Sequence, residues 1–101
     1  MSAKERITKN EERLDSIILS VKELEKALDN FKKNKKNIYY LDKYYGSDNW
    51  FKDKEAFEKG KISNVKAGVL GEDTIWNLFE DIDYLLKDMN KIIKVMGKNE
   101  K

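Results

Sequence analysis

The chain has 101 residues, of which 40% are hydrophobic and 40% are charged, and its net charge is +2. It contains no proline, cysteine or histidine, which excludes disulfide frameworks, thiolate metal sites and histidine-dependent catalysis. The nearly balanced charge creates no overall field that would drive the chain onto nucleic acid or a membrane surface. We expect a single domain over residues 1–101 with one modest hydrophobic core.

The sequence contains no segment that resembles a membrane anchor. No stretch approaches the roughly 20 apolar residues that a membrane-spanning helix needs, and the polar start, Met-Ser-Ala-Lys-Glu-Arg, lacks the apolar region of a signal peptide. We therefore expect a cytoplasmic protein without a membrane partner.

Residues 3–45 are predicted to form one long amphipathic helix. Its apolar residues recur at intervals of three, four and seven, which is the spacing of a helix that packs against another helix in a coiled-coil manner. This first seam consists of Ile7, Leu14, Ile17, Val21, Leu24, Leu28 and Phe31. A polar run at residues 32–37 is able to end or kink the helix. Because Ile38 and Tyr45 keep the heptad phase, we favour a continuous or gently kinked helix as far as Tyr45.

Two further helices are predicted after Gly46. Ser47 is a suitable N-cap for a short helix over about 47–58, and Gly60 follows that helix. After a connection over residues 61–70, a final helix is predicted over about 72–96. Its second seam consists of Ile75, Leu78, Ile82, Leu85, Met89, Ile92 and Met96.

The predicted fold class is therefore all-α. A long N-terminal helix, a short central helix and an antiparallel C-terminal helix would form a helical hairpin or bundle with a coiled-coil-like seam. At 1.5 Å per residue, a helix over 3–45 would be about 60 Å long and the final helix only about 37 Å. Part of the first seam must then meet the central segment or a second copy of the chain, so the sequence also allows a homodimer.

The centre of the chain carries a series of short motifs. These are Tyr-Tyr-Gly-Ser-Asp-Asn-Trp at 44–50, the acidic pair Asp53 and Glu55, Gly60, and Gly-Val-Leu-Gly-Glu-Asp at 68–73. Their order resembles a family of small bacterial proteins described as a domain of unknown function, with the pattern Tyr-Tyr-x-Ser-x-x-Trp and a Gly-Val-Leu-Ser-Glu-Asp box. Gly71 and Ser63 stand where that pattern has serine and proline. The resemblance covers residues 44–76; it implies an architecture and brings no activity.

Five carboxylates lie in these motifs, at Asp48, Asp53, Glu55, Glu72 and Asp73. Converging carboxylates can bind Mg²⁺ or Ca²⁺, or act as a general acid and base. Their spacing matches no calcium-loop signature, and helix capping with dipole complementarity explains them more simply. We expect no catalytic residue, no metal ligand and no cofactor, and we expect that the protein is not an enzyme.

The leading hypothesis is a non-enzymatic protein–protein interaction module, or a regulator or inhibitor, with an unidentified protein partner. Aromatic residues beside glycine turns either belong to the core or form the hot spot of an interface. The candidate partner-binding residues are Tyr45, Trp50, Asp53, Glu55, Glu72 and Asp73.

A nucleic-acid-binding accessory protein is the alternative. It would use the basic run of Lys32, Lys33, Lys35 and Lys36, which two tyrosines, Tyr39 and Tyr40, follow. Lysines can neutralise phosphates while aromatic rings stack on bases. Acidic residues precede this run and weaken the evidence for a nucleic-acid-binding surface. A solvated helix face explains the lysines better.

Overall fold

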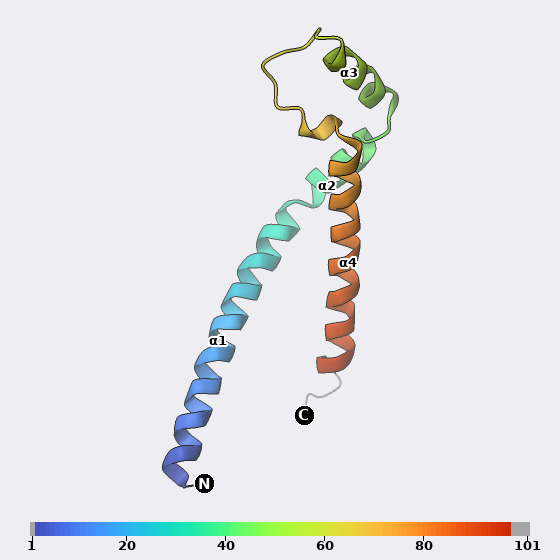
Figure 1. Cartoon of the computed structure of the whole chain (residues 1–101). Coiled ribbons are helices and arrows are strands. Elements are labelled where there is room, and N and C mark those ends of the chain that lie inside the picture. The colour runs from blue at the N-terminus through green and yellow to red at the C-terminus, as the bar shows by residue number, and fades with distance from the viewer. Residues whose placement is uncertain (1, 98–101) are drawn as a thin grey trace. The chain divides into compact units, whose positions relative to one another are not determined.

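A computed structural model describes residues 2–97, and that part of the chain consists of helices and turns without a strand (Figure 1). The all-α prediction is confirmed. Four α-helices and one short 3-10 helix, η1, follow one another: α1 (Ala3–Lys33), α2 (Lys35–Tyr44), α3 (Asp48–Glu58), η1 (Gly68–Leu70) and α4 (Glu72–Met96). The chain divides into two compact units, Met1–Asp42 and Lys43–Lys101. The antiparallel placement of the last helix and the single domain over 1–101 stay predictions.

Helix α1 begins with a capping box. The Ser2 hydroxyl accepts a hydrogen bond from the Glu5 backbone N–H at 3.2 Å, and the Glu5 carboxylate accepts one from the Ser2 backbone N–H at 3.1 Å. Both bonds satisfy N–H groups that the first turn of a helix leaves without a partner. The hydrogen bonds from the Ser2 backbone and hydroxyl lower the pKa of Glu5. The Ser-x-x-Glu spacing was a sequence signal for this helix start.

The first unit contains no second layer that could cover the apolar face of α1. It consists of α1 and most of α2, which follow one another along the chain. No residue of α1 is buried. In the first seam, Ile17 is 60% exposed and Leu24 is 58% exposed.

The long helix is interrupted at Asn34, which lies within the polar run at 32–37. Asn34 has φ −90° and ψ 3°, and its N–H donates to the Phe31 carbonyl at 3.0 Å. Its side-chain amide donates to the Asn30 carbonyl at 3.1 Å and accepts from the Asn37 side chain at 3.0 Å. These bonds compete with the regular helical pattern, as asparagine side chains often do. Helix α2 then ends at Tyr44.

The second unit is organised by a turn at Gly46, whose φ is +75°. The Ser47 hydroxyl caps α3 by accepting the Trp50 N–H at 3.2 Å, and it also donates to the Tyr44 carbonyl at 2.7 Å. Gly60, again with φ +75°, follows α3. Gly71 is the N-cap of α4 and offers no side-chain hydrogen bond.

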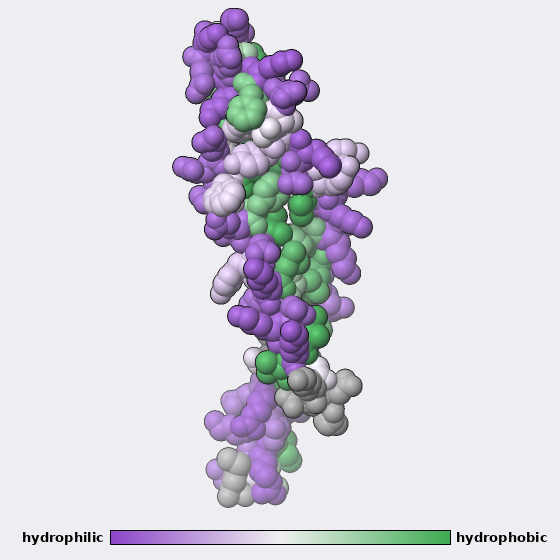
Figure 2. Space-filling view, turned by 90° about the vertical axis from the view of Figure 1, so that its right-hand side faces the viewer, coloured by the Kyte–Doolittle hydropathy of each residue, from purple (hydrophilic) through white to green (hydrophobic). Residues whose placement is uncertain are grey.

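The core of the described chain is small. Trp50 and Ile75 are its buried hydrophobic residues, at 1% and 3% exposure. Along α4 the apolar side chains Leu78, Leu85 and Ile92 are exposed. Figure 2 shows a stripe of apolar side chains at the surface with hydrophilic residues on both sides of it. Within residues 2–97, no helix combines the length and apolar character that crossing a membrane requires.

Candidate functional site

All six predicted partner-binding residues lie in the central corner, residues 44–73, and the side chains of three of them, Tyr45, Trp50 and Asp53, make hydrogen bonds between its elements. Its first contact joins Tyr44 and Asp53, both half-buried. The Tyr44 hydroxyl donates to the Asp53 carboxylate at 2.6 Å, which ties the end of α2 to α3. This hydrogen bond, together with burial and the negative charge of Asp53, raises the pKa of Tyr44 to about 12. Asp53 therefore makes a tertiary contact within the second unit.

The second contact joins Tyr45 to the start of α4. The half-buried Tyr45 donates its hydroxyl to the Glu72 backbone carbonyl at 3.3 Å. Since Tyr45 directly follows α2, this bond fixes where α4 begins with respect to the turn at Gly46.

Trp50 is the central core residue of this corner. Its indole N–H donates to the Val69 carbonyl at 3.0 Å, which joins α3 to η1. The rings of Tyr45 and Phe51 contact it edge-on, with centroids 5.3 and 5.0 Å away. The Lys54 ammonium lies 5.1 Å from the centroid of the indole ring, within the range of a cation–π interaction. A side chain that is 1% exposed has almost no surface for a partner, so the structure supports the core interpretation of Trp50.

The remaining predicted carboxylates are exposed. Glu55 forms an ion pair with Lys59 at 2.6 Å, one turn later on α3. Glu72 and Asp73 occupy the first turn of α4, where negative charge complements the helix dipole. Among residues 2–97, no group of three or more metal-ligating side chains could hold a metal ion. Glu55, Glu72 and Asp73 stay predicted partner contacts.

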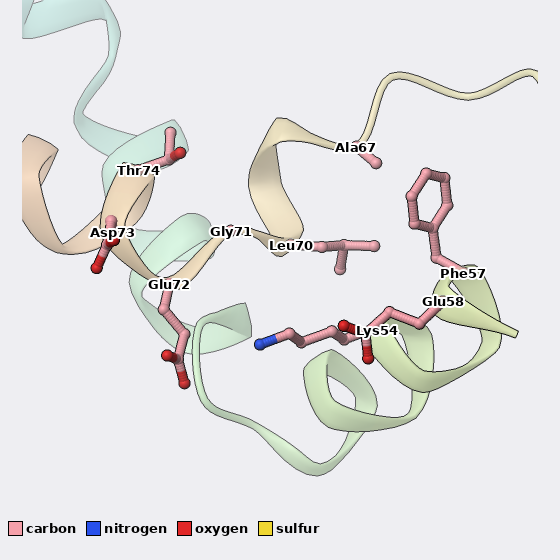
Figure 3. Close-up of a pocket in the computed structure, with 9 residues that line it drawn as sticks. All are labelled: Lys54, Phe57, Glu58, Ala67, Leu70, Gly71, Glu72, Asp73 and Thr74. Atoms are coloured by element: carbon pink, nitrogen blue, oxygen red, sulfur yellow. The ribbon is translucent and has the colours of Figure 1, made fainter.

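An open hollow of about 520 Å³ lies between α3, η1 and the start of α4. Figure 3 shows Lys54 extending from α3 towards the start of α4, where Glu72 and Asp73 lie. Phe57 and Leu70 provide an apolar side to the hollow. The lining therefore combines charged side chains of both signs with an apolar side. The sequence interpretation missed Lys54 and Phe57, because only the packing of α3 on η1 brings them to this hollow.

The four lysines of the basic run lie on either side of the interruption at Asn34. Lys32 and Lys33 end α1, Lys35 and Lys36 begin α2, and all four are exposed. One turn later, Tyr39 and Tyr40 are 57% and 65% exposed, with their rings edge-on at 5.5 Å. The local structure thus presents lysines and aromatic rings in one short segment.

A family comparison covers both units. The model of the domain of unknown function DUF4298 matches residues 7–92. The chain belongs to this family. The match confirms the resemblance carried by residues 44–76 and extends it over α1 and most of α4. No curated protein and no solved structure matches the chain. The family description assigns no activity, so DUF4298 membership leaves the function to be argued from the surfaces described above.

Proposed function

We propose that this DUF4298 protein is a non-enzymatic, cytoplasmic protein-interaction module that binds its partner through the first seam of α1. One observation carries the proposal: α1 has seven apolar residues at heptad positions, yet no residue of the helix is buried. Contiguous apolar surface on this scale is uncommon on proteins that act alone and is typical of interaction sites. With this face the protein would occupy a surface of its partner and so act as a regulator or inhibitor.

The energetics of α1 favour a helical partner. Full burial of a leucine or isoleucine side chain contributes about 1.5–3 kcal/mol, and Ile17, Val21 and Leu24 are each at least half exposed. Most of the stability of protein helices comes from packing an amphipathic face, and isolated helices in water are marginal. A partner helix laid along the first seam would therefore gain affinity and stabilise α1.

In this proposal the central corner has two roles. Tyr45, Trp50 and Asp53 hold the second unit together through the contacts given above. The exposed Glu55, Glu72 and Asp73 would provide a second, polar set of contacts on the second unit. These carboxylates suit a partner with basic residues at its edge.

Site-specific photo-crosslinking in living cells tests the proposal. A benzoylphenylalanine at Ile18, which flanks the first seam, should give adducts of defined mass that mass spectrometry can identify. The matched control places the same probe at Ser16, an exposed residue on the polar face of α1, where no defined adduct is expected. Equal labelling at the two positions, or none at Ile18, would argue against the first seam as the interface.

Nucleic-acid binding is the second candidate, and the exposed pair Tyr39 and Tyr40 beside the lysines favours it. Four phosphate contacts by Lys32, Lys33, Lys35 and Lys36 would give single-strand affinity a salt slope of about −3. Fluorescence anisotropy with a labelled single strand measures that slope. Replacing all four lysines by glutamine should abolish both the affinity and the slope, while the same change at Lys4, Lys9, Lys22 and Lys26 should not.

A further inference from the structure

A second hollow, of about 300 Å³, lies between the end of α2, α3, the connection over residues 59–67 and η1. Its volume is at the lower end of the range of pockets that hold ligands, and all of its residues belong to the second unit. Figure 3 shows Phe57, Ala67 and Leu70, which line this hollow as well as the first. The apolar lining consists of Phe57, Ile62, Val65, Ala67, Val69 and Leu70.

The polar groups of the second hollow are Tyr44, Asp53 and Lys66. The Tyr44 hydroxyl donates to Oδ2 of Asp53 at 2.6 Å. Among residues 2–97, the other carboxylate oxygen, Oδ1, has neither a hydrogen-bond partner nor an ion-pair partner. Every buried polar side-chain atom in that part of the chain has a hydrogen-bond partner, so Oδ1 is reachable from solvent. Asp53 therefore brings an unpaired negative charge to a largely apolar hollow.

Lys66 does not neutralise this carboxylate. Its side chain is exposed, and the structure contains no ion pair between it and Asp53. An exposed lysine ammonium keeps its strong hydration on a flexible stem. The half-buried Asp53 has lost part of its hydration beside apolar side chains, and a charge in such a place is stabilised by a paired cation. The hollow is thus complementary to a cation that is carried on an apolar stem.

Among the basic side chains, arginine fits this hollow best. Its guanidinium is planar and more weakly hydrated than an ammonium, and it donates to a carboxylate through more than one N–H group. It also stacks on aromatic rings. Phe57 follows Asp53 by four residues on α3, so the two side chains are neighbours on one face of that helix. An arginine on Asp53 would therefore have an aromatic ring beside it.

We infer that the second hollow receives an arginine side chain of the partner protein, with its guanidinium on Oδ1 of Asp53 and its stem against Phe57. The inference rests on the proposed function and adds to it a contact on the second unit. The hydrogen bond from Tyr44 holds the carboxylate in place before the arginine arrives, which lowers the cost of ordering it on binding.

NMR titration of the isotope-labelled full-length chain tests this site with small probes. N-acetyl-arginine amide carries the guanidinium, and N-acetyl-citrulline amide has nearly the same shape without the charge. The arginine probe should shift the amide signals of Asp53, Phe57 and Leu70 in a saturable way. Its affinity should exceed that of the citrulline probe about tenfold, because a hydrogen bond to a charged group is stronger than one between neutral groups. N-acetyl-lysine amide should bind more weakly than the arginine probe.

Two pairs of variants locate the binding. Asp53→Asn keeps an oxygen that accepts from Tyr44 and removes the charge, so it should weaken binding of the arginine probe about tenfold. Asp81→Asn makes the same change at an exposed residue of α4 and should leave the affinity unchanged. Should Asp53→Asn fail to fold, Ile62→Lys places a cation at the wall of the hollow and should also weaken binding. Ser63→Lys adds the same charge outside the lining and should not.

The outcomes separate this inference from the proposed function. Equal affinity for the arginine and citrulline probes, or shifts that persist in Asp53→Asn and Ile62→Lys, would overturn the site. A lysine probe that binds as tightly as the arginine probe would overturn the choice of arginine. If the site is overturned and the probe at Ile18 still gives a defined adduct, the proposed function stands without it. Arginine binding without an adduct from Ile18 would keep the site and contradict the proposed function.

Discussion

Trp50 joins α3 to η1 through its hydrogen bond to Val69, and its indole ring contacts Tyr45 in the turn after α2. Truncating a buried tryptophan to alanine removes a large contact area and leaves a cavity, at a cost of about 3–5 kcal/mol. Trp50→Ala should therefore unfold the second unit or nearly so. Trp76→Ala, at a position that is 56% exposed, should change stability by less than about 1 kcal/mol. Urea unfolding followed by circular dichroism compares the two; equal losses would contradict the core role of Trp50.

Replacing Tyr44 by phenylalanine tests whether the contact of its hydroxyl with Asp53 stabilises the central corner. Tyr44→Phe keeps the ring and removes the hydroxyl that donates to the carboxylate at 2.6 Å. A hydrogen bond to a charged group contributes about 1.5–3 kcal/mol, so the free energy of unfolding should fall by that amount. Tyr40→Phe, at an exposed tyrosine, is the control. An unchanged stability in Tyr44→Phe would show that the bond adds nothing.

The same residue gives the protein a dependence on alkaline pH. In the folded chain the pKa of Tyr44 is raised to about 12, whereas an unfolded tyrosine has a pKa near 10. Between these values the unfolded chain loses the proton that the folded chain keeps, so stability falls as pH rises from about 10 to 12. Below pH 10 the full contribution is present. The difference in stability between wild type and Tyr44→Phe should shrink across this window, and a constant difference would contradict the assignment.

At the scale of elements, the turn between α2 and α3 depends on Gly46. Its φ of +75° is a conformation that side chains disfavour, and a Cβ there would meet no atom within 4 Å. The cost of Gly46→Ala is therefore conformational alone, about 1–2 kcal/mol. Gly68→Ala, which also meets no atom and has no positive φ, should be nearly neutral. Thermal unfolding of the two variants makes the comparison; similar melting temperatures would mean that the turn tolerates another conformation.

The helices themselves were largely predictable from local sequence. Heptad spacing located α1 and α4, and the glycines with Ser47 located the start and end of α3. The interruption at Asn34 was harder to place, because Ile38 keeps the heptad phase across it. Side-chain hydrogen bonds among Asn30, Asn34 and Asn37 decide the local geometry, and apolar periodicity does not contain that information.

The sequence predicted which residues of the candidate site lie close together, but not what each side chain does there. The motifs correctly grouped Tyr45, Trp50 and Asp53 in one corner. Burial of Trp50 depends on its bond to Val69, 19 residues later, and the use of Asp53 depends on Tyr44, nine residues earlier. The sequence motif shows that Trp50 is aromatic and that Asp53 is acidic, but it does not show whether either side chain faces inward.

At the scale of the whole molecule, the DUF4298 match over residues 7–92 includes the first seam and the central corner. The corner fixes the turn between α2 and α3 and the start of α4, while α1 presents an apolar face that its own unit leaves uncovered. In our account, this division separates a locally folded corner from a helix that completes its packing against a partner.

Photo-crosslinking from Ile18 in cells tests that account most directly. With the probe at Ile18, the otherwise wild-type chain should give an adduct of defined mass. The same probe in an Ile17→Asp/Leu24→Asp background should give none, because burying unpaired carboxylates in the interface costs several kcal/mol, whereas Ser16→Asp/Asn30→Asp adds the same charges on the polar face and should keep the adduct. No defined adduct from the wild-type background, or an undiminished adduct from the Ile17→Asp/Leu24→Asp background, would contradict the account.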